Sequence, residues 1–380
     1  MNILVTDGSF KQSLGIVRSL GKDGFKPYIL SSKKNSLCSF SKYSNKEIIL
    51  KPNQYKSELS KYLSKFSIEL IIVVGTNSFK NILPIKKDLN DLGTDMVTVD
   101  IDKINIAFSK VDTYKFAESI GIPVPKTFYP NDFSELTDLK SKITYPCVIK
   151  GLYEVGGNIV DYVYKEEELE KKYSQICNDY KLSPKNGLPM LQEYITGYGC
   201  GFFAIYNEGK CGITFQHKRI REYPVSGGAS VCSESYRNEK LQEYGMRLLD
   251  GLEWHGVAMV EFKMNSQGVP VLMEINPKFW GSCDLALEAG VNFPKAIIDI
   301  YLGKEVLYSM DYKYPFKYHW PLNDDIMHGI KNPKKCLEIF IDLLNPKVKS
   351  NIWISDFKPN MRLLIDFLLK PFIEIYRKIS

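Results

Sequence analysis

Two glutamates and an asparagine near the middle of the chain have the types and the spacing of a metal site. Glu261 lies in a run rich in β-branched and apolar residues. Glu274 and Asn276 lie in a second such run, after a turn at residues 265–268. The pattern predicts a β-hairpin. Residues i and i+2 of a strand point to the same side, so Glu274 and Asn276 share a face, and pairing across the turn can bring Glu261 opposite them.

Three oxygen donors on one surface suit Mg²⁺, which usually keeps further positions for water and phosphate oxygens. Carboxylates that share a face also repel one another unless a cation lies between them. Acidic residues on a strand are more often a solvated face, and the hairpin alone leaves that interpretation open. It is therefore a candidate magnesium site that needs support from elsewhere in the chain.

Residues upstream of the hairpin have the pattern of a nucleotide site. Lys150 closes an apolar strand, and the loop that follows contains Gly156 and Gly157. A lysine at a strand end can reach a phosphate, and glycines let backbone N–H groups approach phosphate oxygens. A surface lysine before an ordinary hairpin would look the same, and Lys110, before a predicted helix, is weaker in isolation. The predicted strand at 190–195 could offer backbone groups to an adenine edge or be a plain core strand.

A basic strand end lies between these two groups. His217, Lys218, Arg219 and Arg221 follow one another closely, and the small residues at 226–230 predict a flexible loop after them. Arg219 and Arg221 are predicted to share a face. A basic, solvated edge strand is the alternative. Because the strand leads toward the predicted metal site, we favour a role in holding an acceptor carboxylate or a transferred phosphate.

Size and composition are those of an ordinary globular protein. A chain of 380 residues exceeds the usual single hydrophobic core, so two or three domains are expected. Apolar residues make up 44% and charged residues 25%, which argues against a disordered chain. The net charge of +6 fits a weak preference for anionic small molecules and requires no nucleic-acid groove, so no nucleic-acid partner is expected.

The cysteines and the N-terminus predict a soluble, cytoplasmic protein. The eight cysteines form no CxxC pair and have no histidine at zinc spacing, so we expect reduced packing residues. The N-terminal residues begin a strand instead of a charged-then-apolar signal. No apolar run approaches the roughly 18 residues of a membrane span.

The first hundred residues alternate short apolar strands with amphipathic helices, and 95–99 is the last strand expected there. This alternation predicts a parallel sheet with helices on both faces. The turn at 6–9 is of a kind that holds ligands, but it is not GxGxxG and lacks the acidic ribose-binding residue about 20 residues later. A nicotinamide enzyme therefore gets little support. The strands and hairpins that follow predict an α+β unit with antiparallel sheets, and the end of the chain is helical.

The C-terminal stretch 360–380 is amphipathic and basic at its end. It could lie on an anionic membrane surface, but such a helix more often packs its apolar face on the parent domain. Asp366 and Glu374 dilute its basic face, so we expect no contact with a membrane surface.

Taken in order, these features resemble the ATP-grasp superfamily over residues 1–303. The similar segments are SKVDTYKFAESIGIPVP, YPCVIKGLYEVGGN, LQEYITG and, most specifically, VEFKMNSQGVPVLMEINPKFWGS. The chain looks closest to the carbamoyl-phosphate-synthase-like ligases, which join a carboxylate to an amine. The resemblance implies an α/β plus α+β fold in four parts: an N-terminal parallel-sheet domain (1–109), a lid (110–195), an antiparallel-sheet core with the metal site (196–305) and a helical C-terminal extension (306–380).

The resemblance also implies roles for individual residues. The ATP phosphates would be held by two lysines and covered by a glycine loop: Lys110, Lys150, Gly156 and Gly157. The adenine would be lined by one strand end, with the first carbonyl and the last N–H bonding its edge: Gln192, Glu193, Tyr194 and Ile195. Mg²⁺, for which Mn²⁺ could substitute, would be bound between the β- and γ-phosphates by Glu261, Glu274 and Asn276.

Two positions depart from the family pattern. Many members place an acidic residue shortly after the adenine strand to hold the ribose hydroxyls, where this chain has Thr-Gly-Tyr-Gly at 196–199. Many also have an arginine two residues after the metal-binding asparagine, where this chain has Lys278. Lysine keeps the charge but loses the bidentate fork that suits a carboxylate or an acyl phosphate.

The activity that the resemblance implies is an ATP-dependent C–N ligase. A carboxylate would attack the γ-phosphoryl group, and an amine would then attack the acyl phosphate to form an amide or peptide bond. The resulting oxyanion would be stabilised by Arg219, Arg221 or Lys278. The partners would be a small-molecule carboxylate and amine, and class analogy suggests a homodimer. The alternative is a sensor or scaffold that binds ATP and Mg²⁺ without ligase turnover.

Overall fold

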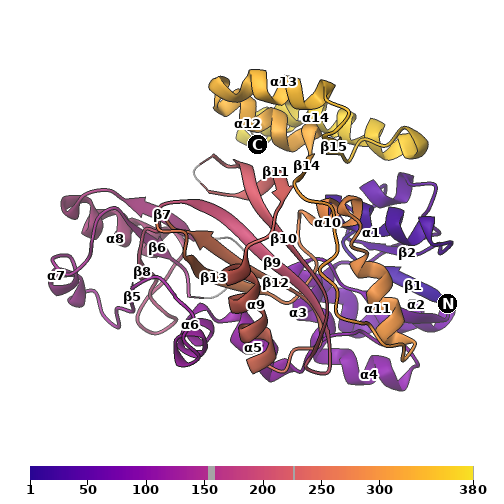
Figure 1. Cartoon of the computed structure of the whole chain (residues 1–380), viewed down its shortest axis with the longest axis horizontal. Coiled ribbons are helices and arrows are strands. Elements are labelled where there is room, and N and C mark those ends of the chain that lie inside the picture. Colours follow the sequence, from indigo (N-terminus) through magenta and orange to yellow (C-terminus); the bar gives the residue numbers. More distant parts are fainter. Residues whose placement is uncertain (153–158, 226, 380) are drawn as a thin grey trace.

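The described residues of the computed structural model form three β-sheets with helices around them (Figure 1). The structure describes all residues except 153–158, 226 and 380, and it leaves out the side chains of 323 and 370–379. A parallel sheet comes first along the chain, a small antiparallel sheet second and a large central sheet third.

The N-terminal sheet has four parallel strands in the order β3-β2-β1-β4. Its strands are β1 (Asn2–Val5), β2 (Tyr28–Ser31), β3 (Glu47–Ile49) and β4 (Ile68–Ile72). Its helices are α1 (Lys11–Lys22), α2 (Ser60–Lys65), α3 (Thr76–Ile82), α4 (Lys86–Asp91) and α5 (Ile101–Phe108). Successive side chains of β1 enter two cores, because Leu4 packs on the side of α2 and α3 whereas Ile3 and Val5 pack on the side of α1. The predicted parallel sheet with helices on both faces is confirmed.

The strand predicted at residues 95–99 was wrong, because this segment forms only one bridge, from Asp95 to Leu70 of β4. Beyond Asp95 the segment passes the start of the central strand β12 (Gly256–Met264). A Cβ added at Gly256, whose φ is +86°, would lie 2.8 Å from Val97 O. Close contact between these two backbones takes the place of further pairing with β4.

The second sheet, which we call the lid sheet, is antiparallel and has the order β5-β8-β6-β7. Its strands are β5 (Thr127–Phe128), β6 (Cys147–Lys150), β7 (Val160–Val163) and β8 (Met190–Glu193), and its helices are α7 (Glu135–Leu139) and α8 (Leu169–Asp179). A core of its own, which includes Leu169, Tyr173 and Leu191, holds it together. The lid sheet projects from the body at the left of Figure 1. The preceding helix α6 (Lys110–Ser119) packs instead against the central strand β13 (Pro270–Asn276).

The central sheet has seven strands in the order β13-β12-β9-β10-β11-β14-β15. Its long strands are β9 (Tyr198–Asn207), β10 (Lys210–Tyr223) and β11 (Ala229–Ser235), besides β12 and β13. The helices that cover it are α9 (Glu239–Gly251), α10 (Cys283–Ala289) and α11 (Phe293–Tyr301). Strand β9 is buried on both faces, because Phe202 packs in the core that contains α9 and Phe203 in the core that contains α10 and α11. Its continuous apolar sequence follows from that burial.

The segment after residue 305, predicted to be a helical extension, also completes the central sheet. Strand β14 (Phe316–His319) pairs antiparallel with β11, and β15 (Lys349–Ser350) pairs parallel with β14. The helices α12 (Ile326–Lys331), α13 (Cys336–Leu344) and α14 (Phe357–Ile379) lie at the top of Figure 1, and we call them the C-terminal layer.

A buried arginine ties the C-terminal segment to the N-terminal domain. Arg18 of α1 is 2% exposed, and its Nε donates to Asp356 Oδ2 at 2.9 Å. Its two terminal nitrogens donate to Asn351 O at 2.7 Å and to Asn360 Oδ1 at 3.2 Å. Removal of one partner from such a buried ion pair leaves an uncompensated charge.

We predict that Arg18→Ala lowers the free energy of unfolding by about 3–5 kcal/mol, because Asp356 loses its buried partner. Urea denaturation followed by circular dichroism measures the change. The control is Lys61→Ala, an exposed helix position that we expect to change stability by less than about 0.5 kcal/mol. Equal midpoints for the two variants would show that the Arg18 network does not hold the C-terminal segment in place.

Candidate active site

The hairpin of β12 and β13 places Glu261 directly opposite Glu274. Asn276 follows Glu274 on the same strand, and its Nδ2 donates to Glu274 Oε1 at 2.8 Å. The turn between the strands lies at residues 265–268, as predicted, with Gly268 at a φ of +73°. The hairpin therefore brings the three predicted metal ligands together.

Each of these three side chains contacts a cationic side chain, and for the two glutamates that cation comes from a distant part of the chain. Arg219 of β10 donates to Glu261 Oε2 at 2.5 Å. Lys110, at the start of α6, has its Nζ 3.6 Å from Glu274 Oε2. Lys278 Nζ donates to Asn276 Oδ1 at 3.3 Å. These contacts balance the negative charge of the hairpin.

The two carboxylates of the hairpin differ in their proton affinity. Burial raises the pKa of Glu261, with a further contribution from the Glu274 carboxylate, although Arg219 opposes both. Burial acts in the same direction on Glu274, but Lys110, the hydrogen bond from Asn276 and Lys278 outweigh it and hold the pKa of Glu274 below its ordinary value. Glu274 is thus the more strongly anionic of the pair.

Lys150 ends strand β6 and is held by the lid sheet. Its Nζ donates to Gln192 Oε1 at 2.7 Å, and Gln192 Nε2 donates in turn to Tyr114 OH at 3.2 Å. Burial, together with the nearby Lys110 ammonium, lowers the pKa of Lys150 to about 8. An anion that binds beside this buried ammonium group would therefore stabilise its protonated form. The glycines predicted to act with it, Gly156 and Gly157, lie outside the described residues.

A cleft of about 670 Å³ lies between the lid sheet and the central sheet. Its wall includes Lys110 and Lys150, the Glu261–Glu274 pair and Arg219. Cofactor sites are typically of this size. The cleft therefore collects, in one place, most of the residues that the sequence predicted for nucleotide and metal binding.

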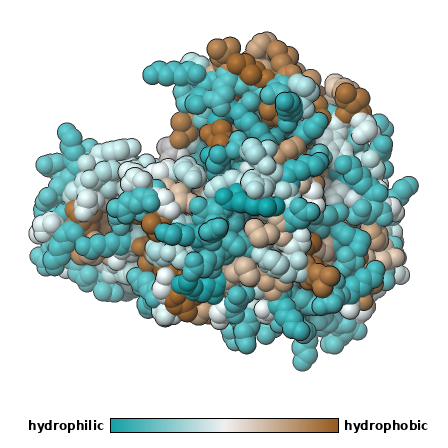
Figure 2. Space-filling view, in the orientation of Figure 1, coloured by the Kyte–Doolittle hydropathy of each residue, from teal (hydrophilic) through white to brown (hydrophobic). Residues whose placement is uncertain are grey.

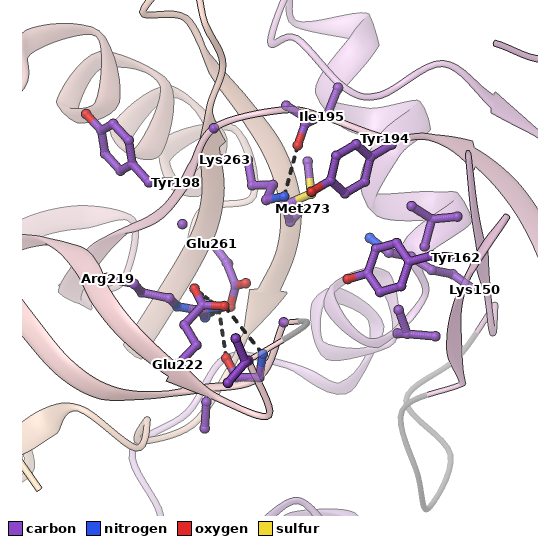
Figure 3. A pocket seen from close by; sticks show the side chains of 18 of the residues that line it. Lys150, Tyr162, Tyr194, Ile195, Tyr198, Arg219, Glu222, Glu261, Lys263 and Met273 are labelled. Atoms are coloured by element: carbon purple, nitrogen blue, oxygen red, sulfur yellow. Dashed lines mark hydrogen bonds and ion pairs between the residues drawn. The ribbon is translucent and has the colours of Figure 1, made fainter. Parts of the chain in front are cut away.

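One end of the cleft is aromatic. The rings of Tyr194 and Tyr162 meet edge to face with centroids 5.8 Å apart. Lys263 Nζ donates to Ile195 O at 2.9 Å and lies 4.8 Å from the centre of the Tyr194 ring. Figure 3 shows these side chains at one end of the cleft, with Arg219 and Glu261 at the other. Gln192, expected to present its carbonyl to an adenine, lies within β8 between residues of β5 and β6.

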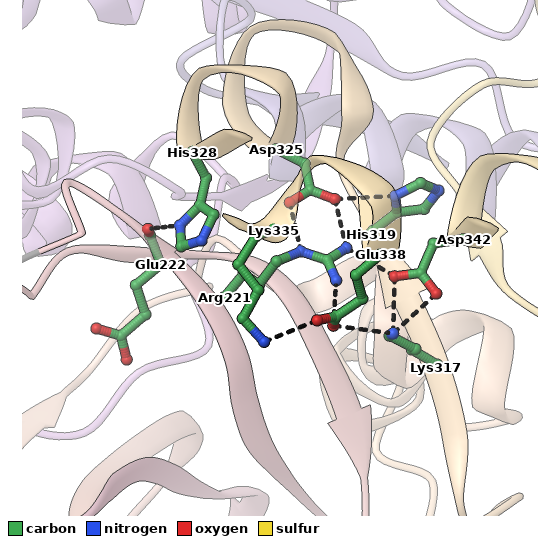
Figure 4. Close-up of polar contacts among 9 residues, drawn as sticks. All are labelled: Arg221, Glu222, Lys317, His319, Asp325, His328, Lys335, Glu338 and Asp342. Carbon is green, nitrogen blue, oxygen red and sulfur yellow. Dashed lines mark hydrogen bonds and ion pairs between the residues drawn. The ribbon is translucent and has the colours of Figure 1, made fainter. Parts of the chain in front are cut away.

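Arg219 and Arg221 do not share a face, so that prediction was wrong. The pairing of β10 with β11 shifts register between the two arginines, and such a bulge breaks the alternation of side chains. Arg219 points to Glu261, whereas Arg221 is fully buried and bonds Asp325 at 2.6 Å and Glu338 at 2.7 Å. Figure 4 shows the Arg221 cluster beneath the C-terminal layer, with Lys317 and His319 as further members.

Several residues of the cleft were not predicted. Lys263 lies two residues after Glu261 on the same strand, and strand periodicity alone could have found it. Glu222, which lies 3.6 Å from Arg219, gives no comparable signal. The C-terminal layer contributes a further set to the wall: His328, Asn332 and Lys335. These three residues reach the cleft only because the C-terminal layer packs on the central sheet.

The oxygen donors of the hairpin fit a hard divalent cation. Mg²⁺ is commonly held by one or two carboxylates together with phosphate oxygens, and Glu261 and Glu274 with the Asn276 amide oxygen supply such a set. The described residues contain no group of three or more His, Cys, Asp or Glu that could hold a metal ion. The hairpin offers two carboxylates and one amide oxygen. A cation held there would need further oxygens, from the nucleotide or from water, to complete its coordination.

A family model described as ATP-grasp in the biosynthetic pathway with Ter operon matches residues 190–321. Among curated proteins, the chain is 26% identical over 230 residues to the C-terminal section of the carbamoyl phosphate synthase large chain of Methanopyrus kandleri. That match covers 58% of this chain and 41% of the relative, so the chain spans less than half the length of this curated relative.

Two solved structures share the fold at low sequence identity. Biotin carboxylase from Campylobacter jejuni superposes with a TM-score of 0.69 at 15% identity, over 83% of this chain and 74% of that one. The dimeric biotin carboxylase domain of Hydrogenobacter thermophilus 2-oxoglutarate carboxylase, solved with MgADP and bicarbonate, gives 0.68 at 15% identity, over 83% and 73%. The chain therefore has the fold of these two structures, and an ATP-grasp family model matches its residues 190–321.

Proposed function

We propose that this protein is an ATP-dependent ligase that activates a substrate carboxylate as an acyl phosphate and joins it to an amine. The observation that carries the proposal is one cleft with an aromatic end, two lysines along its wall and a paired-carboxylate hairpin at its far end. These three features suit the adenine, the phosphates and the metal ion of a bound Mg-nucleotide. The relatives named above, a carbamoyl phosphate synthase and two biotin carboxylases, support the same assignment.

In this proposal the nucleotide lies along the cleft. Tyr162 and Tyr194 contact the adenine, and the Ile195 N–H and a carbonyl of the same strand end bond its edge. Lys110 and Lys150 hold the phosphates, since both side chains line the cleft and Lys110 Nζ lies 3.6 Å from Glu274 Oε2. Glu193 and the 156–157 glycines keep the supporting roles that the superfamily resemblance gives them.

The hairpin would hold the metal ion through Glu261, Glu274 and Asn276. Mg²⁺, or Mn²⁺ in its place, supplies positive charge that screens the phosphates as the γ-phosphoryl group is transferred. Arg219 and Lys110 now balance the two carboxylates, and a bound cation would free both side chains for oxygens of the substrates.

The chemistry has two steps. A carboxylate oxygen attacks the γ-phosphorus, the bond from that phosphorus to the β–γ bridging oxygen breaks, and ADP leaves. The amine nitrogen then attacks the carbonyl carbon, inorganic phosphate leaves, and the nitrogen loses a proton. Arg219 and Lys278 stabilise the oxyanion of the second step. Arg221 is omitted from this scheme because Asp325, Glu338 and Asp342 already hold its guanidinium group.

We expect ADP release that requires a carboxylate and an amine together. A coupled ADP assay across amino acids and sugar acids, with mass detection of the adduct, identifies the pair. If Mg-ADP binds but no pair yields ADP, the protein is a nucleotide sensor or scaffold and the ligase proposal is wrong.

We predict that Glu274→Gln lowers both the affinity for Mg-ADP and the rate of ADP formation by at least roughly 100-fold, because the site loses its more strongly anionic ligand. The control is Glu234→Gln. Glu234 pairs with Lys218 on the same sheet at 2.8 Å and is 24% exposed, close to the 26% of Glu274. Calorimetry with Mg-ADP measures affinity. An unchanged affinity in Glu274→Gln would remove this residue from the metal site.

The pKa of Lys150 predicts how nucleotide affinity depends on pH. The protonated lysine binds phosphate, so affinity for Mg-ADP should be constant below pH 8 and fall above it. The affinity should fall by up to about tenfold per pH unit until the pH passes the pKa of Lys150 in the nucleotide complex, which is higher than in the free protein. The charges of Lys110 and Lys263 disfavour protonation of Lys150, whereas the carboxylates of Glu261 and Glu274 favour it.

The matched variant for this test is Lys150→Arg, whose guanidinium stays charged throughout the range. Its affinity for Mg-ADP, titrated between about pH 6.5 and 9.5, should show no decline above pH 8. The same decline in both proteins would assign the titration to another group.

A further inference from the structure

Helix α13 turns a row of large apolar side chains to the solvent. Leu337, Phe340, Ile341 and Leu344 are all exposed, with Leu337 at 70% and Leu344 at 68%. Their spacing of three and four residues places them on one face of the helix. The opposite face supplies Ile339 and Asp342 to the interior.

Helix α14 repeats this arrangement. Its solvent-exposed apolar residues again recur every three or four positions: Phe357, Met361, Leu364, Ile365 and Leu368. Ile354, just before the helix, is 91% exposed. Figure 2 shows the resulting gathering of hydrophobic side chains along the top of the molecule, over α13 and α14. We call these exposed residues of α13, α14 and position 354 the apolar roof.

The exposed charged residues of the C-terminal segment between residues 331 and 369 are positive. Exposed lysines of the same segment are Lys331, Lys334, Lys347, Lys349 and Lys358. The four carboxylates between residues 331 and 369 are Glu338, Asp342, Asp356 and Asp366. The first three bond Arg221 or Arg18 on the inner side of the layer, and Asp366 pairs with Arg362. The segment thus presents lysines outward while most of its acids are engaged below, as Figure 4 shows for Glu338 and Asp342.

The apolar roof is a fixed part of the fold. The Arg18 network holds the start of α14, and the Arg221 cluster holds α13. A gathering of exposed apolar side chains that the fold holds in place in this way marks an interaction site. No helix in the described part of the chain is both long and apolar enough to cross a bilayer.

We propose that the apolar roof docks in the plane of an anionic phospholipid bilayer. The two helix faces would enter the headgroup region, and the surrounding lysines would meet lipid phosphates, which is how interfacial helices bind. A second copy of this chain fits less well, because the exposed lysines of two C-terminal layers would repel one another. The expectation of no membrane contact assumed that the apolar face of the last helix packs inward, and the exposed side chains of α14 contradict that assumption.

Docking would place the candidate active site at the membrane surface. The C-terminal layer that carries the apolar roof also lines the cleft through His328, Asn332 and Lys335. This inference stands whether or not the protein is a ligase, because it uses none of the residues proposed to bind ATP or the metal ion.

The test is sedimentation of the full chain with vesicles of phosphatidylcholine alone or mixed with phosphatidylglycerol. We expect binding to the mixed vesicles, at least roughly tenfold weaker binding to phosphatidylcholine alone, and a decrease with rising salt. The double substitution Phe340→Ser with Leu344→Ser should weaken binding by a further factor of roughly ten or more.

Leu307→Ser is the matched control, since Leu307 is also 70% exposed but lies outside the apolar roof. It should bind vesicles as the unmodified protein does. Circular dichroism melting of both variants checks that the exposed substitutions leave the fold intact, and Leu337→Ser provides a milder second variant in α13.

Three results would overturn the proposal. The first is no sedimentation with anionic vesicles. The second is equal loss of binding in the Leu307→Ser control and the α13 variants. The third is a dimer, measured by analytical ultracentrifugation without lipid, that dissociates when Phe340 and Leu344 are changed, because the apolar roof would then be covered by a second copy.

Discussion

The carboxylate pair of the β12–β13 hairpin is the interaction on which the rest of the site depends. Glu261 and Glu274 lie directly opposite one another and are largely withdrawn from water, so their repulsion must be balanced by positive charge. Arg219 and Lys110 supply that charge from elements far apart in the chain. A single divalent cation, bound together with a nucleotide, would balance the charge of both carboxylates. In the proposed function, ligand binding and charge balance would be a single event at this hairpin.

The fold keeps this hairpin rigid and places the other groups around it. The central strand β9, buried on both faces, pairs with β12 along its whole length and fixes the position of Glu261. The lid sheet has a core of its own and carries Lys150 and Tyr194 to the opposite wall of the cleft. One bulge in β10 then points the side chains of Arg219 and Arg221 in different directions. Arg219 faces the carboxylates, whereas Arg221 holds the C-terminal layer in place.

Local patterns in the sequence predicted most of what is local in the structure. The hairpin, its turn and the shared face of Glu274 and Asn276 follow from alternation over a few residues, and so does the position of Lys150 at a strand end. The register shift near Arg221 and the pairing of β14 with β11 depend on contacts between segments far apart in the chain, which no single-sequence period reveals. The last helix was predicted, but its exposed face depends on what lies beneath it.

The most direct measurement for the account is a crystal structure with Mn²⁺ and a non-hydrolysable ATP analogue, read by anomalous scattering from the metal. We predict one Mn²⁺ bonded to oxygens of Glu261, Glu274 and Asn276 and to the β- and γ-phosphates, with Lys150 on the phosphates and Arg219 released from Glu261. Nucleotide bound elsewhere, or a metal peak away from this hairpin with both carboxylates still paired to Arg219 and Lys110, would contradict the account.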